Sequence, residues 1–168
     1  LSCGGWIYDS IMELPLLKKV ILIGPDEEAF SRVEPEFKEK VEFLSRERLL
    51  EMEETEVSAF VKNQVGEYPL YISIDKDVLC ETDADTNWSQ GDMRLSTMLE
   101  CLGAVKEKCA ERISRILGVD ICGECDVTEP GNSALNDMAN AALLEFFTST
   151  DVGEDIEENK NGTTGGNG

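Results

Sequence analysis

Residues 69–79 read Pro-Leu-Tyr-Ile-Ser-Ile-Asp-Lys-Asp-Val-Leu, an apolar, β-prone run that ends in two carboxylates. On a β-strand successive side chains point to opposite faces, so Asp75 and Asp77 are predicted to share one face. Two like charges held together repel, and a shared cation offsets that repulsion. Hard divalent ions such as Mg²⁺ or Mn²⁺ suit carboxylate ligands. The spacing also fits a solvated strand end, because Asp is a common turn starter.

The chain is acidic, with 35 Asp and Glu residues against 15 Lys and Arg residues and a formal net charge of −20. Such a surface repels phosphate, which argues against nucleic-acid partners and anionic membranes. No apolar run approaches the roughly 18 residues needed to span a bilayer, and no secretory signal pattern opens the chain. At 168 residues the chain is long enough for one domain with a hydrophobic core, and we expect a cytoplasmic protein.

Histidine is absent and six cysteines are present. Without histidine the chain cannot build a Ser-His-Asp triad, a Cys-His pair or a His-ligated zinc site from its own residues. The scatter of the cysteines through apolar segments is typical of buried cytosolic thiols. Cys122 and Cys125 form a Cys-x-x-C pair, for which a redox pair, half a zinc site and two structural cysteines are the alternatives.

Strands and helices are predicted to alternate along the chain, which favours an α/β fold with a parallel sheet and flanking helices. Ligands bind beyond the carboxyl ends of such strands, so Asp75, Asp77 and the acidic segment 120–126 are expected in one crevice. Asp92 is expected to cap a helix, and Trp6 and Met138 to face the core. The expected strands are 18–24, 40–44, 70–75 and 115–122, although 35–50 also fits a helix, and the expected helices are 2–12, 55–65, 92–109 and 133–147.

Residues 80–91 form a polar connection that is longer than usual, which favours a functional role. Residues 151–168 are acidic and then rich in Asn, Gly and Thr. They offer too little apolar surface to pack, so we expect a disordered tail after a domain of residues 1–150.

Over residues 68–147 the sequence resembles the C-terminal half of the arginase/agmatinase (ureohydrolase) family. Residues 73–77, Ser-Ile-Asp-Lys-Asp, are similar to its Ser-x-Asp-x-Asp signature, and residues 118–121, Gly-Val-Asp-Ile, match a later Gly-x-Asp-Ile strand. The resemblance implies an arginase/deacetylase-like three-layer αβα fold, incomplete in this chain. It also implies that Asp75 and Asp77 ligate a binuclear Mn²⁺ centre.

The chain departs from the family pattern in three places. Cys80-Glu81 stands where the family has Asp-Pro, and the acidic residue after Gly-x-Asp-Ile falls one place late, at Glu124. The family glutamate there recognises the substrate guanidinium, which implies that role for Glu124, or less favourably for Asp126. The family's remaining metal ligands lie in Gly-Gly-Asp-His and Asp-Ala-His-x-Asp segments, and the chain has neither. Because the chain also starts at Leu1, we expect it to be the C-terminal part of a larger arginase-like protein.

The resemblance implies a metal-dependent hydrolase of C–N bonds in small guanidino or amide substrates, with the upstream ligands missing from this chain. No catalytic residue is assigned, and Asp120 is expected to be structural. The alternatives are a non-catalytic remnant of the arginase fold and an unrelated acidic α/β binding module. Exposed sheet edges would favour association, so a homo-oligomer is possible.

Overall fold

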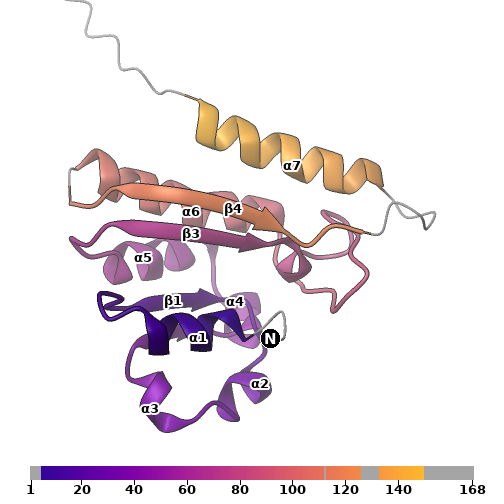
Figure 1. Cartoon of the computed structure of the whole chain (residues 1–168). Coiled ribbons are helices and arrows are strands. Elements are labelled where there is room, and N and C mark those ends of the chain that lie inside the picture. Colours follow the sequence, from indigo (N-terminus) through magenta and orange to yellow (C-terminus); the bar gives the residue numbers. More distant parts are fainter. Residues whose placement is uncertain (1–4, 112, 126–132, 150–168) are drawn as a thin grey trace, which may run out of the picture.

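The computed structural model describes residues 5–111, 113–125 and 133–149 (Figure 1). Helices and strands alternate, as predicted, and the strands are short. The elements are α1 (Trp6–Glu13), β1 (Val20–Ile23), α2 (Glu27–Ser31), α3 (Pro35–Lys38), β2 (Val41–Leu44), α4 (Arg46–Glu51), α5 (Glu54–Gln64), β3 (Leu70–Asp75), the 3₁₀ turn η1 (Lys76–Val78), α6 (Leu95–Ala110), β4 (Ile116–Cys122) and α7 (Ser133–Thr148).

The strands pair in parallel, but in the described ranges they form two separate two-stranded sheets. β1 pairs with β2 from Val20↔Val41 to Ile23↔Leu44, and β3 pairs with β4 from Leu70↔Ile116 to Asp75↔Cys122. The mixed α/β class and the parallel pairing are therefore confirmed. The single continuous sheet is wrong, because no described strand bridges β1 and β3.

Local capping resolves the ambiguity of residues 35–50. Ser45 accepts a hydrogen bond from the Arg48 amide at 3.2 Å and so starts α4, directly after β2. Pro35 lies in the first turn of α3, where a missing amide hydrogen costs nothing because the first amides of a helix have no partner within it. The segment between α3 and α4 forms the strand β2. Asp26 caps α2 in the same way as Ser45 caps α4, accepting from the Ala29 amide at 2.6 Å.

Two connected hydrophobic clusters hold the strands and helices together. One joins Ile74 of β3 to α6 and α7 through Met98, Leu102, Ala139 and Leu143. The other joins β2 to α5 and α6; its buried members are Leu44, Val57, Val61, Val65, Cys101 and Ala104. In Figure 1, α5 and α6 lie behind the strands and α1 lies in front of β1.

Three sequence predictions at the helix surfaces are wrong. Trp6 and Met138 are 47% and 68% exposed, because each lies outside the buried stripe of its helix. Asp92 does not cap α6: Arg94 holds that position, and Asp92 pairs with Arg46. Asp83 takes over the capping role, because its carboxylate accepts a hydrogen bond from the Leu95 amide at 2.8 Å.

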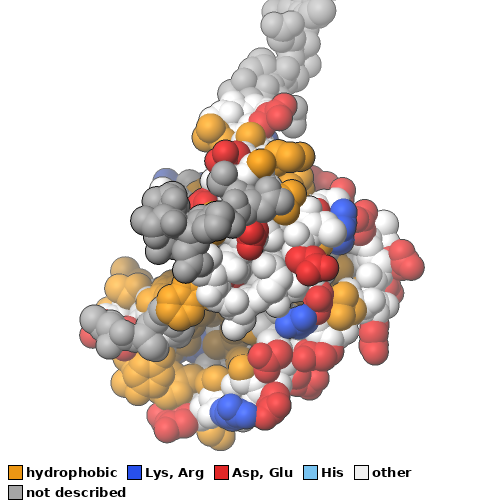
Figure 2. Space-filling view, turned by 90° about the vertical axis from the view of Figure 1, so that its right-hand side faces the viewer, with side chains coloured by type: hydrophobic (Ala, Val, Ile, Leu, Met, Phe, Trp, Pro, Cys, Tyr) orange, Lys and Arg blue, Asp and Glu red, His pale blue; other side chains and the backbone are white. Residues whose placement is uncertain are grey.

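No helix among the described residues is both long and apolar enough to cross a membrane. The predicted tail lies outside the described residues. On the face shown in Figure 2, acidic side chains far outnumber basic ones, which agrees with the net charge.

Candidate acidic site at the ends of the parallel strands

Asp75 and Asp77 lie together, but the strand does not bring them together. β3 ends at Asp75, and Asp77 lies in the 3₁₀ turn η1. Asp75 Oδ1 accepts a hydrogen bond from the Asp77 amide at 3.1 Å and so caps this turn. The expectation that strand alternation places both side chains on one face is therefore wrong, and the turn is the physical cause of their proximity.

Three glycines from distant parts of the chain crowd the same turn. A Cβ on Gly24, after β1, would lie 2.1 Å from Val78 Cγ2, and one on Gly91 would lie 2.1 Å from the Val78 carbonyl oxygen. A Cβ on Gly123, after β4, would lie 2.7 Å from Asp75 Oδ1. The ends of β1, β3 and β4 thus converge on residues 75–78. Sequence reasoning did not predict that these glycines meet, although Gly24 ends one predicted strand and Gly123 directly follows another.

The surroundings of Asp77 disfavour its charged form. Its burial, and after that the negative charge of Asp75, raise the pKa of Asp77 above its ordinary value of 3.8. The hydroxyl of Thr86 partly offsets this rise. The contact falls short of a hydrogen bond, because neither Asp77 Oδ1 nor Thr86 Oγ1 has a partner among the described residues. A buried, unpartnered carboxylate oxygen beside a second carboxylate is a favourable place for a cation.

Glu124, the predicted substrate contact, lies in a different polar cluster. The ammonium of Lys76, fully buried, donates to Glu124 Oε1 and, at 2.8 Å, to Asn140 Oδ1. Asn140 Nδ2 donates to the same Glu124 oxygen at 2.8 Å. The hydrogen bond from Lys76 lowers the pKa of Glu124 below its ordinary value. The side chain of Glu124 therefore already neutralises a cation of this chain. Asp126 lies outside the described residues.

Asp120 has the structural role expected of it. It lies opposite Ser73 in the β3–β4 ladder and accepts a hydrogen bond from the Ser73 hydroxyl at 2.9 Å. Its interaction with Tyr71 raises the pKa of that phenol above its ordinary value. Asp120 of β4 thus interacts with two side chains of β3, those of Ser73 and Tyr71.

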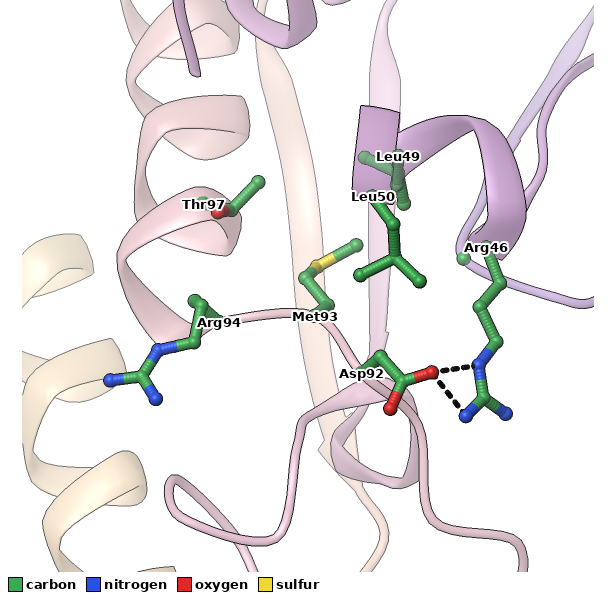
Figure 3. A pocket seen from close by; sticks show the side chains of 8 residues that line it. Arg46, Leu49, Leu50, Asp92, Met93, Arg94 and Thr97 are labelled. Atoms are coloured by element: carbon green, nitrogen blue, oxygen red, sulfur yellow. Dashed lines mark hydrogen bonds and ion pairs between the residues drawn. The ribbon is translucent and has the colours of Figure 1, made fainter. Parts of the chain in front are cut away.

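Two cavities adjoin this region. A small one of about 160 Å³ lies between α4 and the start of α6, where Arg46 forms an ion pair with Asp92 (Figure 3). A cleft of about 1200 Å³ extends between β1 and β3 and reaches Asp75, Asp77 and Asp120. Small-molecule pockets typically measure about 300–1,000 Å³, so the small cavity lies below that range and the cleft above it.

Within the described ranges, no group of three or more acidic, cysteine or histidine side chains is arranged to hold a metal ion. Asp75 and Asp77 would therefore be partial ligands of any metal centre. Carboxylate oxygens are suitable ligands for Mn²⁺, so the residue types fit the ion that the resemblance implies.

Cys122 lies beside the acidic pair, which bears on the Cys-x-x-C alternatives. Burial, followed by the charges of Asp75, Asp120 and Asp77, raises the pKa of the Cys122 thiol above its ordinary value of 9.0. A reactive cysteine needs the opposite shift, because the thiolate is the nucleophile. Cys122 and Cys125 are both free thiols in the structure. The surroundings thus favour the structural alternative over the redox one.

We expect Cys122 to react slowly with iodoacetamide at neutral pH, with a pH–rate profile whose midpoint lies above 9.0. Asp75→Asn should move the midpoint down because it removes a repelling charge next to the thiolate. Mass spectrometry of the alkylated peptide measures both rates. A midpoint below 9.0 in the unaltered protein would restore the redox interpretation.

No protein-family model matches this chain. An uncharacterized protein of Thermotoga maritima is 32% identical to it over 150 residues, which are 88% of this chain and 51% of that protein. The chain therefore spans about half the length of the curated relative that it matches.

Proposed function

We propose that this chain belongs to an arginase-type, metal-dependent hydrolase of C–N bonds in small guanidino or amide substrates. In this proposal the strands form part of a three-layer αβα domain, and Asp75 and Asp77 supply two carboxylate ligands to a binuclear Mn²⁺ centre. The observation that supports it most directly is the buried, unpartnered Oδ1 of Asp77 next to the Asp75 carboxylate. The similarity of residues 73–77 to the arginase signature supports the choice of metal and reaction.

A bound metal pair would supply a water of lowered pKa that attacks the sp² carbon of the substrate. In this proposal Asp75 and Asp77, which line the cleft, hold negative charge there and fix its position. Asp75 is oriented by the Asp77 amide, and Asp77 by its place in the turn. The excess of acidic residues favours a cationic substrate.

Glu124 is the substrate ligand that the resemblance implies, and in this proposal the substrate competes with Lys76 for its carboxylate. The Lys76 ammonium already pairs with its carboxylate, so a cationic substrate would have to displace or share that contact. Further metal ligands would come from residues other than the described ones, since those contain no three-ligand group.

The test is a calorimetric titration of the metal-free chain with MnCl₂, which measures the affinity for Mn²⁺. We expect weak binding in the unaltered chain. Asp77→Asn, which keeps the shape but removes the charge, should weaken it by at least about tenfold, because even outer-shell partners of metal ligands change affinity by 10–100-fold. Binding should also weaken as the pH falls toward the raised pKa of Asp77, since protons compete with the metal.

Asp137→Asn is the matched control, because Asp137 is an exposed carboxylate on α7, a helix of which no described residue lines the cleft at the acidic pair. It should bind Mn²⁺ as the unaltered chain does. Equal affinity in Asp77→Asn and the unaltered chain would remove Asp77 from the ligand set. Equal losses in both variants would show binding to the general negative charge instead.

A non-catalytic remnant of the same fold is the second candidate. The observation that favours it is the lack of a third metal ligand in the described part of the chain. Such a protein would keep the fold around residues 75–78, bind Mn²⁺ weakly in the same titration, and show no turnover in a longer version that includes the upstream region.

A further inference from the structure

The cleft between the two sheets opens on the edges of β1 and β3. All of β1 and all of β3 line it. Successive residues of a strand point to opposite faces, so a cavity that touches every residue of a strand lies at its edge. In the part of the chain that the structure describes, β1 pairs only with β2 and β3 only with β4. The arrows of β1 and β3 in Figure 1 run in the same direction on either side of this space.

The backbone of β1 presents hydrogen-bonding groups to the cleft. Val20 donates to Lys40 O at 2.8 Å and Gly24 to Leu44 O at 2.9 Å, both toward β2. In a parallel ladder alternate residues direct both backbone groups to the same neighbour. The amides and carbonyls of Ile21 and Ile23 therefore point away from β2, toward the cleft.

The same reasoning applies to β3. Leu70 donates to Arg115 O at 2.8 Å, next to β4. The register shifts between Leu70 and Tyr71, where Leu117 of β4 is the extra residue, so β3 itself has no inserted residue. Alternation along β3 then turns the backbone groups of Tyr71 and Ser73 toward the cleft. Two strand edges, parallel to each other, thus face one space with their hydrogen-bonding groups directed into it.

Most side chains that line the cleft are apolar, as in a hydrophobic core, but those of β1 are only partly covered. Parallel strands are normally buried on both faces, and the Val-Ile-Leu-Ile sequence of β1 suits that environment. Nevertheless, each of its four residues is only half-buried. The cleft is lined by apolar side chains from α1, α5 and α6 and from the residues that directly follow α1 and α5, among them Ile7, Leu14, Val61, Val65, Met98 and Leu102.

We propose that this cleft is the docking site for one further parallel β-strand, an apolar segment of about five residues. The lengths of β1 and β3, four and six residues, set that estimate. We assign the strand to a polypeptide equivalent to the half of the Thermotoga maritima protein that this chain does not match. The proposal does not depend on metal binding.

Other occupants fit the cleft less well. Its volume of about 1200 Å³ exceeds that of ordinary small-molecule pockets. The stretches 1–4, 126–132 and 150–168 of this chain contain no two consecutive apolar residues, so their composition does not suit an inner parallel strand. A second copy of the chain is the remaining competitor, and the experiment distinguishes it.

The experiment refolds the isotopically labelled full chain together with the unlabelled, unmatched part of the Thermotoga maritima protein, each expressed separately. Light scattering after gel filtration should show a one-to-one complex. Amide hydrogen exchange by NMR should slow at Ile21, Ile23, Tyr71 and Ser73 on complex formation. Exchange at Leu22 and Ile72, already directed toward β2 and β4, should change little. This alternation is a signature of an inserted strand that general stabilisation would not give.

A pair of variants at one position isolates the backbone hydrogen bond. Tyr71 is 64% exposed, so its replacement loses little packing. Tyr71→Pro removes an amide that faces the cleft, whereas Tyr71→Ala keeps it. We expect the Pro variant to bind at least about tenfold more weakly than the Ala variant, which corresponds to the loss of one backbone hydrogen bond.

Three results would overturn the proposal. The first is the absence of a complex after the two polypeptides are refolded together. The second is a complex in which the four amides exchange as in the free chain. The third is protection of those amides through self-association of the chain alone. Circular dichroism of both Tyr71 variants checks that they fold, and the exchange experiment on the unaltered chain needs no variant at all.

Discussion

Gly123→Ala should be among the most damaging single substitutions in this chain, destabilising it by about 2–4 kcal/mol. Gly123 has a φ of +82°, where an L side chain is strained, and its added Cβ would lie 2.7 Å from both Asp75 Oδ1 and the Lys76 amide nitrogen. Neither neighbour can yield easily, because both belong to the turn that holds the acidic pair. For a protein of this size the loss corresponds to a fall in melting temperature of roughly 5–15 °C, measured by circular dichroism.

Gly103→Ala is the matched control. Gly103 lies within α6, and nothing lies within 4 Å of its added Cβ. Alanine is the better helix former by about 0.5–1 kcal/mol, so this variant should be slightly more stable than the unaltered chain. If Gly123→Ala melted at or above the temperature of Gly103→Ala, the close approach of β4 to the turn would be wrong.

Glu124→Ala should cost about 2–3 kcal/mol, because it leaves the buried ammonium of Lys76 without its carboxylate partner. Breaking a buried pair costs about 3–5 kcal/mol, and the value here is smaller since the side chain of Glu124 is 54% exposed whereas that of Lys76 is 0% exposed. Lys76→Met, of similar length, should cost less, because it removes the buried charge and leaves Glu124 accessible to water and bonded to Asn140. Urea unfolding measures both values.

The double variant tests the cause of that loss. Once Lys76→Met is present, Glu124→Ala should have little further effect, because no buried charge remains to be left unpaired. An undiminished cost of Glu124→Ala in the Lys76→Met background would show that Glu124 stabilises the chain by another route.

The same pair makes stability depend on pH in a defined direction. Lys76 holds the pKa of Glu124 below its ordinary value of about 4.5. A carboxyl whose pKa is lower in the folded state stabilises fully above the unfolded value and loses that contribution as the pH falls through the folded value. Unfolding free energies between pH 7 and pH 3 should therefore fall less steeply in Lys76→Met than in the unaltered chain.

Lys76 and the two aspartates beside it in sequence have different surroundings. Lys76, between the two aspartates in sequence, turns away from them and neutralises Glu124. Asp75 and Asp77 consequently receive no ion pair from Lys76, and the charge on Asp77 is offset by no described hydrogen-bond donor at Oδ1. The proposed metal ligands and the internal ion pair thus come from three consecutive residues and Glu124.

The sequence by itself determined the elements of the fold. The strands at 20–23, 70–75 and 116–122 follow from β-prone apolar runs bounded by turn residues, and the helices at 54–64 and 95–110 from their apolar stripes. The acidic pair was visible for the same reason, since two carboxylates after an apolar strand are a local pattern. The helix-surface positions of Trp6, Asp92 and Met138 were assigned wrongly, and so was the shared strand face of Asp75 and Asp77.

The tertiary structure alone decided how these elements meet. The separation of β1 from β3, the ion pair of Lys76 with Glu124 across 48 positions of sequence, and the crowding of Gly24, Gly91 and Gly123 around one turn all depend on long-range contacts. Periodicity specifies which face of an element is apolar, but not which partner covers it. The physical reason is that strand pairing and close backbone approach are properties of two segments, whereas a sequence pattern is a property of one.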